Sequence, residues 1–444
     1  MVLTFKVSNF RSIYGPAELS CVASGRCTEF NEHLMTIHGT DEKSLKVSVV
    51  YGANGAGKSN LYRALRFLVA LALDNPVRDG RLDYLPFAFA GEGDEGSVLD
   101  LQFCTARAVY RYAVAFSRAE IREERLESRV GENLIELYTR TLDDDGGVIR
   151  IGEGLKADLT DKLQAQAVVG TARMRTFLSV VNENLKNGAR GEVLADVLEW
   201  FKSVVFIGPE ARINNLIGPF RDDGFRSFVA GILEQATGVS GLDPATSRMP
   251  AEKVASMIPD PNLRDAVSRL SGQFSMHIDS PASGEIELTR GEGAADFLAT
   301  ELKAAHRLSD GRVGYLNVHE ESDGTKRLLN LLPAIYRIMT VGGVCVIDEL
   351  DRSMHALLSR ALLRAFLSSN GRGQLIFTTQ EDAILDAGYL RRDEVWFAEK
   401  DEKQSTRFFS LDDYRVRTRK DPRAYYFEGR YGAIPLEWTL GGRK

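Results

Sequence analysis

The segment GANGAGKS, Gly52 to Ser59, constrains the fold more than any other part of the 444-residue sequence. It matches the pattern G-x-x-x-x-G-K-[ST]. It follows an apolar run, 45–51, and opens a segment, 57–73, whose apolar residues recur at helical spacing. Glycines let backbone N–H groups turn toward a phosphate, and the helix adds the positive end of its dipole. A glycine-rich turn without function is the alternative, but the two flanks favour a phosphate-binding strand–loop–helix unit.

The residue types in this loop match the chemistry of a nucleoside triphosphate site. Lys58 is expected to reach the β- and γ-phosphates, and the Ser59 hydroxyl is expected to bind Mg²⁺. ATP and Mg²⁺ are therefore the expected cofactors. The predicted ATP-binding residues of the loop are Gly52, Asn54, Gly55, Ala56, Gly57, Lys58, Ser59 and Asn60.

A second motif, VCVIDEL at 344–350, carries the carboxylates that such a site requires. Its apolar residues predict a buried strand, and Asp348 follows at the carboxyl end, where ligands bind in open α/β sheets. Asp348 is expected to hold the Mg²⁺ water shell, and Glu349 is expected to polarise the attacking water. A surface acidic pair would give the same letters. The position downstream of a phosphate loop favours the catalytic interpretation.

A third motif, ESDGTKRLL at 321–329, places Ser322 and Gly324 at the start of a predicted helix. A hydroxyl, a backbone N–H and a helix N-terminus together form an anion site. An ordinary N-cap in front of an apolar stripe explains the same residues equally well. The position of the motif shortly before Asp348 favours the anion site.

The strand and helix patterns predict an α/β protein with a mixed sheet and an antiparallel β meander over 97–130. Strand–helix alternation stops after this meander and resumes near residue 322. The simplest architecture is one domain made of 1–130 and 313–444, whose two parts share a sheet. The intervening residues, 131–312, are expected to form a large, mainly helical insertion for assembly or sensing.

The order of these motifs resembles that of ABC-type ATPases, which implies an ABC-type P-loop ATPase head that hydrolyses ATP. The resemblance covers the two head segments. It implies that Ser322, Gly324 and Thr325 form a signature that contacts the ATP of another protomer, and that Ser353 and His355 belong to the D-loop. A homo-oligomer, at least a dimer through the heads, is therefore expected.

Two further positions come from family resemblance. Gln380 follows the strand-like run QLIFTT at the switch position, where many relatives carry His, and we expect it to be catalytic. A glutamine can hydrogen-bond a phosphate or water but cannot titrate. The opening FKVSNFRSI resembles the start of RecF-, SMC- and OLD-type ATPases, which implies that Arg11 lies near the nucleotide. A surface arginine paired with a carboxylate is the alternative.

The run ESDGTKRLLNLLP and the tail from Leu390 to Pro435 resemble the AbiLi, RloA and AriA group of OLD-like bacterial defence ATPases. This resemblance implies a role in antiviral defence and abortive infection. OLD nucleases carry a TOPRIM domain, and the residues after the last core strand lack its acidic clusters. We therefore expect a separate effector protein, a nuclease, and a phage-encoded trigger as further partners.

Charge and composition narrow the function further. The formal net charge of −6 argues against a dedicated nucleic-acid wrapper but leaves direct DNA binding open. Two interpretations are open for the basic run at 415–423. Its side chains contact nucleic-acid phosphates, or they are ordinary solvent-exposed charges. A RecF- or SMC-like DNA-repair ATPase that clamps DNA is the alternative function. The start lacks a signal peptide and no apolar stretch is long enough to span a bilayer, so a cytoplasmic protein without a membrane partner is expected.

Overall fold

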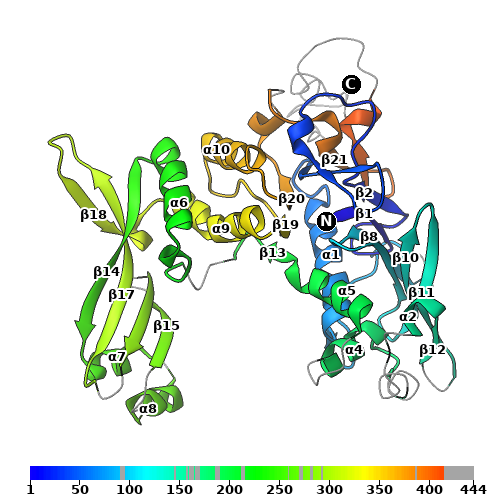
Figure 1. The fold of residues 1–444 in the computed structure, drawn as a ribbon, viewed down its shortest axis with the longest axis horizontal. Helices are drawn as coiled ribbons and strands as arrows, with labels where there is room; N and C mark the ends of the chain where they lie inside the picture. Colours follow the sequence, from blue (N-terminus) through cyan, green and yellow to red (C-terminus); the bar gives the residue numbers. More distant parts are fainter. Residues whose placement is uncertain are drawn as a thin grey trace, which may run out of the picture. The chain divides into compact units, whose positions relative to one another are not determined.

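The computed structural model describes residues 1–90, 96–144, 147–156, 159, 165, 171–185, 191–211, 216–258, 260–269, 274–280, 284–291, 294–385 and 388–414. These residues form two compact units, whose elements are labelled in Figure 1. Unit 1 comprises the described residues of Met1–Pro209, Ile338–Leu350 and Asn370–Lys444. Unit 2 comprises those of Glu210–Arg337 and Asp351–Ser369. Each unit is therefore built from segments far apart in the sequence.

The first sheet of unit 1 has seven strands in the order β12-β11-β10-β9-β8-β1-β2, and neighbouring strands are antiparallel. Burial alternates along β8 and β9 because one face of the sheet packs on the core. The pairing of β8, β9 and β10 confirms the predicted meander over 97–130. The strands are β1 (Val2–Ser8), β2 (Ala17–Ser20), β8 (Ser97–Cys104), β9 (Val109–Phe116), β10 (Ile121–Val130), β11 (Asn133–Leu142) and β12 (Gly147–Ile151).

The second sheet of unit 1 has six strands in the order β13-β19-β20-β5-β21-β22. All pairs are parallel except β21 with β22. Every residue of β5 and β20 is buried, as expected for parallel strands covered on both faces. The pairing of β5 with β20 and β21 confirms that the N- and C-terminal parts share a sheet. The strands are β5 (Val47–Tyr51), β13 (Val205–Ile207), β19 (Gly343–Ile347), β20 (Gly373–Thr379), β21 (Val395–Lys400) and β22 (Thr406–Ser410).

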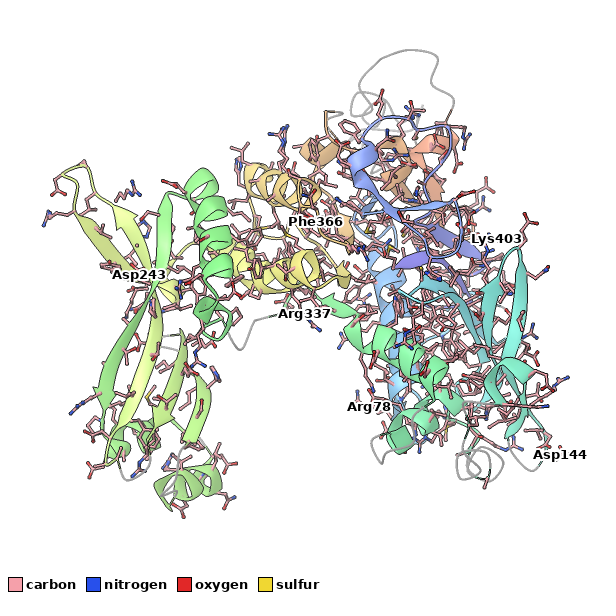
Figure 2. All side chains as sticks on the ribbon, viewed as in Figure 1. Arg78, Asp144, Asp243, Arg337, Phe366 and Lys403 are labelled. Atoms are coloured by element: carbon pink, nitrogen blue, oxygen red, sulfur yellow. The ribbon has the colours of Figure 1, made fainter. Side chains whose placement is uncertain are left out.

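Helix α1 (Lys58–Leu73) forms the centre of the unit 1 core. It buries residues around most of its circumference, as a helix covered on all sides does. It packs against α4 (Phe177–Leu185), α5 (Glu192–Ser203), β1 and β8, and one apolar cluster joins it to both sheets. Figure 2 shows the side chains packed around this helix. The phosphate loop therefore connects two fully buried elements, β5 and α1.

The remaining described elements of unit 1 are short. They are η1 (Asn31–His33), β3 (Leu34–Thr36), β4 (Lys43–Leu45), β6 (Val77–Arg78), β7 (Arg81–Leu82), α2 (Glu153–Lys156), η4 (Asp382–Leu385), η5 (Arg392–Glu394) and η6 (Leu411–Asp413).

Unit 2 contains a sheet in the order β14-β17-β16-β15, with β18 paired to β17. Its own apolar cluster joins strands of this sheet to α7 and α8, while α6 packs on β14 and α10. Helix α9 begins in this unit. The elements are η2 (Pro219–Arg221), α6 (Asp223–Ala236), β14 (Val239–Met249), α7 (Ala251–Met257), α8 (Pro261–Arg269), β15 (Phe274–Ser280), β16 (Gly284–Arg290), β17 (Phe297–Arg307), β18 (Val313–Asn317), η3 (Val318–Glu320), α9 (Asp323–Thr340) and α10 (Ala356–Leu367).

The α/β class with an antiparallel meander is confirmed, but the predicted character of the insertion is not. The expectation that 131–312 is mainly helical was wrong, because β14 to β17 form a sheet within it. The expected boundary between 130 and 131 falls in the turn between β10 and β11, which pair in one sheet. That sheet continues to Ile151 because β12 pairs with β11.

Candidate nucleotide site

The candidate site lies at one edge of the six-stranded sheet. The strands β5, β20 and β19 are parallel neighbours, so their carboxyl ends meet at the same edge. The loop from Gly52 follows β5, Asp348 follows β19 and Gln380 follows β20. This is the edge at which open α/β sheets bind ligands. The structure thus brings together motifs that are separated by almost 300 residues in the sequence.

Lys58 lies across the phosphate loop. Its Nζ donates hydrogen bonds to the Gly52 carbonyl at 2.6 Å and to the Ala53 carbonyl at 3.0 Å. The side chain is only 6% exposed, so its charge is held inside the loop. Asn54 and Gly55 are exposed at the tip, where Gly55 has a φ of 80° that favours glycine. The lysine therefore places a point charge at the centre of a loop of backbone groups.

The start of α1 suits an anion. The helix begins at Lys58 after Gly57, which provides no side-chain cap, and its first turn holds no acidic residue. Uncapped N–H groups and the helix dipole both favour a negative group at this end. The glycines also permit close packing, because a Cβ on Gly52 would lie 2.5 Å from the Ala398 carbonyl oxygen. The loop is thus pressed against β21 and opens toward the helix N-terminus.

Two hydroxyls that no motif indicated secure the other side of the loop. The Thr406 Oγ1 donates to the Ala56 carbonyl at 2.8 Å and lies 2.7 Å from Ser12 Oγ. Asn60 Nδ2 in turn donates to Ser12 Oγ at 2.6 Å. A Cβ on Gly57 would overlap Thr406 and lie 2.6 Å from Ser12 Oγ, which explains the need for glycine there. The N-terminal segment and the β21–β22 hairpin therefore fix the loop jointly.

Ser59 and Asp348 form the contact between the two motifs. Ser59 Oγ donates to Asp348 Oδ1 at 3.0 Å, and Thr378 Oγ1 donates to the same carboxylate oxygen at 2.7 Å. Asp348 is 2% exposed and its backbone N–H is bound by the Ile207 carbonyl at 2.9 Å. The carboxylate is therefore oriented by Thr378 of β20 and Ser59 of α1, while Ile207 of β13 holds the backbone of Asp348.

This donor set fits Mg²⁺. Magnesium prefers oxygen ligands, and protein sites use one or two such groups together with phosphate oxygens and water. Ser59 and Asp348 supply a hydroxyl and a carboxylate in direct contact. In the described part of the chain no three His, Cys, Asp or Glu side chains are grouped to hold a metal ion by themselves. The hydroxyl and carboxylate therefore fit an Mg²⁺ ion that a bound nucleotide would share with them.

Glu349 occupies a turn with unusual backbone geometry. Its φ is 53°, in the left-handed region, and its N–H donates to Thr378 Oγ1 at 2.8 Å. The next N–H, from Leu350, donates to the Thr378 carbonyl at 3.0 Å. The Glu349 side chain is partly exposed, and Gln380, one residue beyond β20, is exposed. Both side chains are at the correct edge, but their roles stay predictions.

Arg11 lies in the N-terminal segment that also carries Ser12. Its backbone φ is 52°, and its N–H donates to the Leu85 carbonyl at 2.8 Å. The pKa of Arg11 is lowered, mainly because partial burial removes water and secondarily because Arg63 repels its charge. Among the described residues, no carboxylate lies within ion-pair distance of it. The charge of Asp83 opposes the shift, so Asp83 is the candidate partner for the alternative interpretation, and the nucleotide role stays a prediction.

Tyr62 of α1 also has a shifted pKa. Burial raises the pKa of its phenol, Arg66 opposes this shift, and Asp348 adds to it. The ring packs edge-on against Phe206 of β13. Tyr62 thus stays neutral and serves as part of the wall behind Asp348.

The predicted signature belongs to unit 2. Ser322 is exposed and precedes α9, where its Oγ accepts from the Thr325 N–H at 3.1 Å and lies 2.9 Å from Thr325 Oγ1. Thr325 is 4% exposed. The hydroxyl therefore caps the helix, as the simpler of the two interpretations stated, and the exposed side chain is still open to solvent. A contact with another protomer's ATP stays a prediction.

The predicted D-loop lies beside this signature within unit 2. A Cβ on Gly324 would lie 2.8 Å from the Ser353 carbonyl oxygen, so the two backbones are in close contact. Ser353 has a φ of 61°, and His355 Nδ1 accepts from the Leu357 N–H at 3.2 Å as the N-cap of α10. The structure thus brings the signature and D-loop residues together at the starts of two helices, α9 and α10.

A phosphate loop, an adjoining serine–aspartate pair and a parallel sheet define a P-loop nucleoside triphosphatase domain. The sequence matches the family described as "AAA domain, putative AbiEii toxin, Type IV TA system" over residues 47–386. The match spans most of the chain and includes the loop and both acidic residues. The chain therefore belongs to this AAA ATPase family.

The chain was also compared with curated proteins and with solved structures. No curated protein matches the sequence. The SMC head domain from Thermotoga maritima is 13% identical, with a TM-score of 0.36, and the alignment covers 92% of this chain and 98% of that chain. An SMC head bound to the C-winged helix domain of ScpA is 11% identical, with a TM-score of 0.38 and coverages of 92% and 97%. An SMC head with an extended coiled coil, bound to the C-terminal domain of ScpA derived from Pyrococcus furiosus, is 12% identical, with a TM-score of 0.34 and coverages of 92% and 96%.

Two sequence expectations concern other parts of the chain. The basic run at 415–423 and the tail as far as Pro435 lie outside the described residues. Of the helices that are described, none has the length and apolar character needed to cross a membrane.

Proposed function

We propose that this protein binds MgATP at the loop around Lys58 and hydrolyses it with Asp348 and Glu349. The observation that carries the proposal is the 3.0 Å hydrogen bond from Ser59 Oγ to Asp348 Oδ1. This hydrogen bond joins the phosphate loop to the acidic motif at 344–350. The contact lies at the sheet edge where the parallel strands β5 and β19 end. Membership of an AAA ATPase family supports the same activity.

Each residue has a defined task in this proposal. Lys58 offers its charge to the β- and γ-phosphates from within the loop, and the α1 N-terminus adds backbone N–H groups. Ser59 and Asp348 would hold Mg²⁺, which when bound neutralises charge on the phosphate oxygens. Glu349 orients water and accepts its proton. Arg11 and Gln380 complete the nucleotide contacts.

A second chain completes the site. Ser322, the Gly324 backbone and Thr325 would contact the γ-phosphate bound by another protomer, with Ser353 and His355 beside them. Charge-assisted hydrogen bonds of this kind are stronger than neutral ones, and ADP cannot supply the γ-phosphate that accepts them. ATP therefore tightens the contact between heads, and ADP loosens it. A symmetric pair would hold two such shared sites.

In the cell, we infer that this ATPase is the sensor and scaffold subunit of a bacterial antiphage defence system. The family description, which names a putative AbiEii toxin and a type IV TA system, supports this inference, as do the defence-ATPase resemblances of the 321–333 run and the tail. ATP state would hold or release a separate effector, a nuclease, in response to a phage-encoded trigger. The chain supplies the nucleotide switch for that partner.

The test combines biochemistry with infection. The purified wild-type chain is expected to release phosphate from ATP only with Mg²⁺, and expression with its genomic neighbours is expected to lower phage plating. Lys58→Ala should remove both effects. A purified, folded chain that binds no ATP would refute the enzymatic proposal. An active ATPase whose expression with its genomic neighbours leaves phage plating unchanged would refute the defence role alone.

A further inference from the structure

Thr378 occupies a central place behind the two acidic residues. It lies near the carboxyl end of β20, the strand between β19, which ends before Asp348, and β5, which ends at the phosphate loop. Its side chain is 4% exposed. No motif and no family description assigns it a role, although its strand lies between the two that lead to the phosphate loop and to Asp348.

Thr378 makes three hydrogen bonds to the turn that carries the acidic residues. Its Oγ1 donates to Asp348 Oδ1 at 2.7 Å and accepts from the Glu349 N–H at 2.8 Å, while its carbonyl accepts from the Leu350 N–H at 3.0 Å. A hydroxyl carries one proton, and the Glu349 N–H can only donate. The proton of Thr378 is therefore directed at Asp348, and the geometry defines both partners.

These contacts act on two properties of the site. Asp348 Oδ1 accepts from Thr378 and from Ser59, so these two hydroxyls together hold the orientation of the carboxylate. Glu349 has a φ of 53°, a conformation that costs energy for a side-chain-bearing residue. The hydrogen bond from its N–H to Thr378 holds the residue in this conformation.

We propose that Thr378 is a positioning residue for ATP hydrolysis, which couples the orientation of Asp348 to the backbone turn at Glu349. This inference rests on the proposed ATPase function. Thr378 acts through the two carboxylates and does not touch the phosphate loop in the described contacts. Loss of the Thr378 hydroxyl should therefore lower turnover and raise the Mg²⁺ concentration needed for half-maximal activity. ATP binding should stay nearly unchanged.

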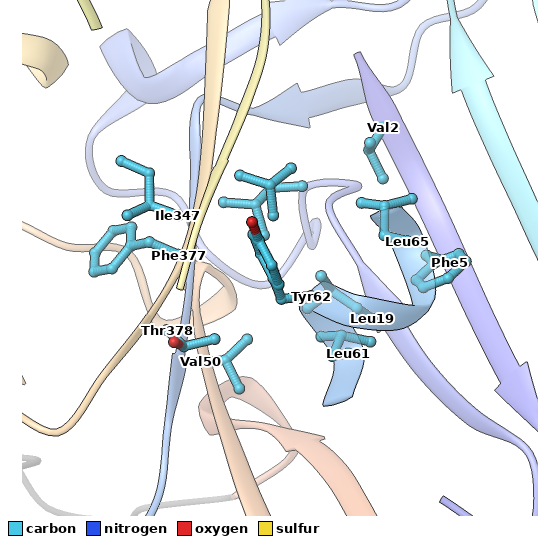
Figure 3. A pocket seen from close by; sticks show the side chains of 12 residues that line it. Val2, Phe5, Leu19, Val50, Leu61, Tyr62, Leu65, Ile347, Phe377 and Thr378 are labelled. Carbon is cyan, nitrogen blue, oxygen red and sulfur yellow. The ribbon is translucent and has the colours of Figure 1, made fainter. Parts of the chain in front are cut away.

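The surroundings of Thr378 make a clean substitution possible. Thr378 also lines a small apolar cavity of about 10 Å³ between α1 and the strands, together with Val50, Leu61 and Tyr62 (Figure 3). In Thr378→Val the new methyl group takes the place of the hydroxyl beside Asp348 and Glu349, so the substitution removes both hydrogen bonds of Oγ1. Thr378→Val keeps the branched shape and removes only the hydrogen-bonding oxygen.

A matched control exists in the other sheet of the same unit. Thr139 is also 4% exposed, and its Oγ1 donates to Glu136 Oε2 at 2.7 Å within β11. Thr139→Val therefore removes a hydroxyl of the same burial that has no contact with the site. It reports what the loss of a buried hydroxyl does to the fold alone.

The experiment measures ATP affinity, kcat, KM for ATP and the half-saturating Mg²⁺ concentration for wild type, Thr378→Val, Thr378→Ser and Thr139→Val. For Thr378→Val we expect kcat to fall about ten- to a hundredfold, the scale of a lost charge-assisted hydrogen bond. Half-saturating Mg²⁺ should rise, and ATP affinity should stay within about threefold. Thr378→Ser keeps the hydroxyl and should restore most of the rate, while Thr139→Val should match wild type.

Several outcomes would overturn the proposal. A Thr378→Val protein with wild-type kcat and Mg²⁺ dependence would do so, and so would equal losses in Thr378→Val and Thr139→Val. If thermal melting shows that Thr378→Val fails to fold, the pair Thr378→Ala and Thr378→Ser decides, whereas a folded Thr378→Val protein that has lost ATP binding would contradict the proposal. Equal rates in that pair would contradict a role for the hydroxyl. A wild-type chain that binds ATP without hydrolysing it would instead refute the ATPase function, on which this inference depends.

Discussion

The phosphate-loop region of unit 1 and the signature region of unit 2 use hydroxyl groups in opposite ways. In unit 1, Ser59, Thr378 and Thr406 bond to groups far away in the sequence, and these bonds assemble a site from several segments. In unit 2, the Ser322 hydroxyl bonds only three residues ahead, at the start of its own helix. The first region is thus assembled by long-range tertiary contacts, whereas the second is a local helix cap that is exposed to solvent. We infer that unit 1 binds the nucleotide and that unit 2 acts on a nucleotide held elsewhere.

The largest expected effect tests the unit 1 side of this comparison. Lys58→Ala removes the buried charge that bridges the Gly52 and Ala53 carbonyls. ATP binding should be almost abolished, because no other cation lies within the loop sequence. Equilibrium binding of a labelled ATP analogue measures this. Lys6→Ala, which removes a half-exposed lysine paired with Glu18 in the same unit, serves as the control and should bind normally.

Glu349→Gln should separate binding from hydrolysis within unit 1. The amide keeps the shape of the side chain but cannot accept a proton from water, so turnover should fall by about 10²-fold or more. Bound ATP should persist, and phosphate release under saturating ATP measures the loss. Glu18→Gln removes a partly exposed carboxylate from β2 and should leave the rate unchanged. Near-normal hydrolysis by Glu349→Gln would assign proton transfer to another group.

A smaller effect on ATP affinity should follow when the phosphate loop loses a supporting hydrogen bond but keeps Lys58. Thr406→Val removes the hydrogen bond to the Ala56 carbonyl and the contact with Ser12 Oγ. ATP affinity should weaken about three- to tenfold, the scale of a lost neutral hydrogen bond. Ser12→Ala should lower ATP affinity less when it is added to Thr406→Val than when it is made in the wild-type chain. The reason is that both hydroxyls belong to one hydrogen-bond network. Additive losses, measured by titration calorimetry, would show that the two hydroxyls act independently.

The sequence predicted the elements that local pattern determines. The run 45–51 and the helical spacing of 57–73 closely match β5 and α1, because buried strands and helices have distinct apolar periods. The acidic motif follows β19 as expected. The sequence singled out the loop residues, Asp348 and Glu349 because their spacing is typical of phosphate and metal chemistry, and their roles stay predictions.

Other parts depend on contacts that no local pattern contains. The segment VSGLDPATSRM, with its glycine and proline, resembles a loop, yet it forms β14 because β17 pairs with it along its length. Sequence reasoning singled out none of Ser12, Thr378 and Thr406, and for Ser12 and Thr406 the reason is that an isolated hydroxyl has no signature. For Thr378 a signal did exist, since two threonines end the strand that precedes Gln380. A hydroxyl at the carboxyl end of a strand near an acidic motif is therefore a candidate for orienting it.

The central claim is that a nucleotide held by unit 1 of one chain is completed by unit 2 of another. Mixing Lys58→Ala with Ser322→Arg protein tests it most directly, with subunit exchange verified and folding of each variant checked by thermal melting. Each variant alone should be inactive, and the mixture should recover part of the wild-type ATPase rate, because one shared site then has an intact Lys58 and an intact Ser322. Full activity of Ser322→Arg alone, with turnover independent of protein concentration down to a proven monomer, would contradict the claim.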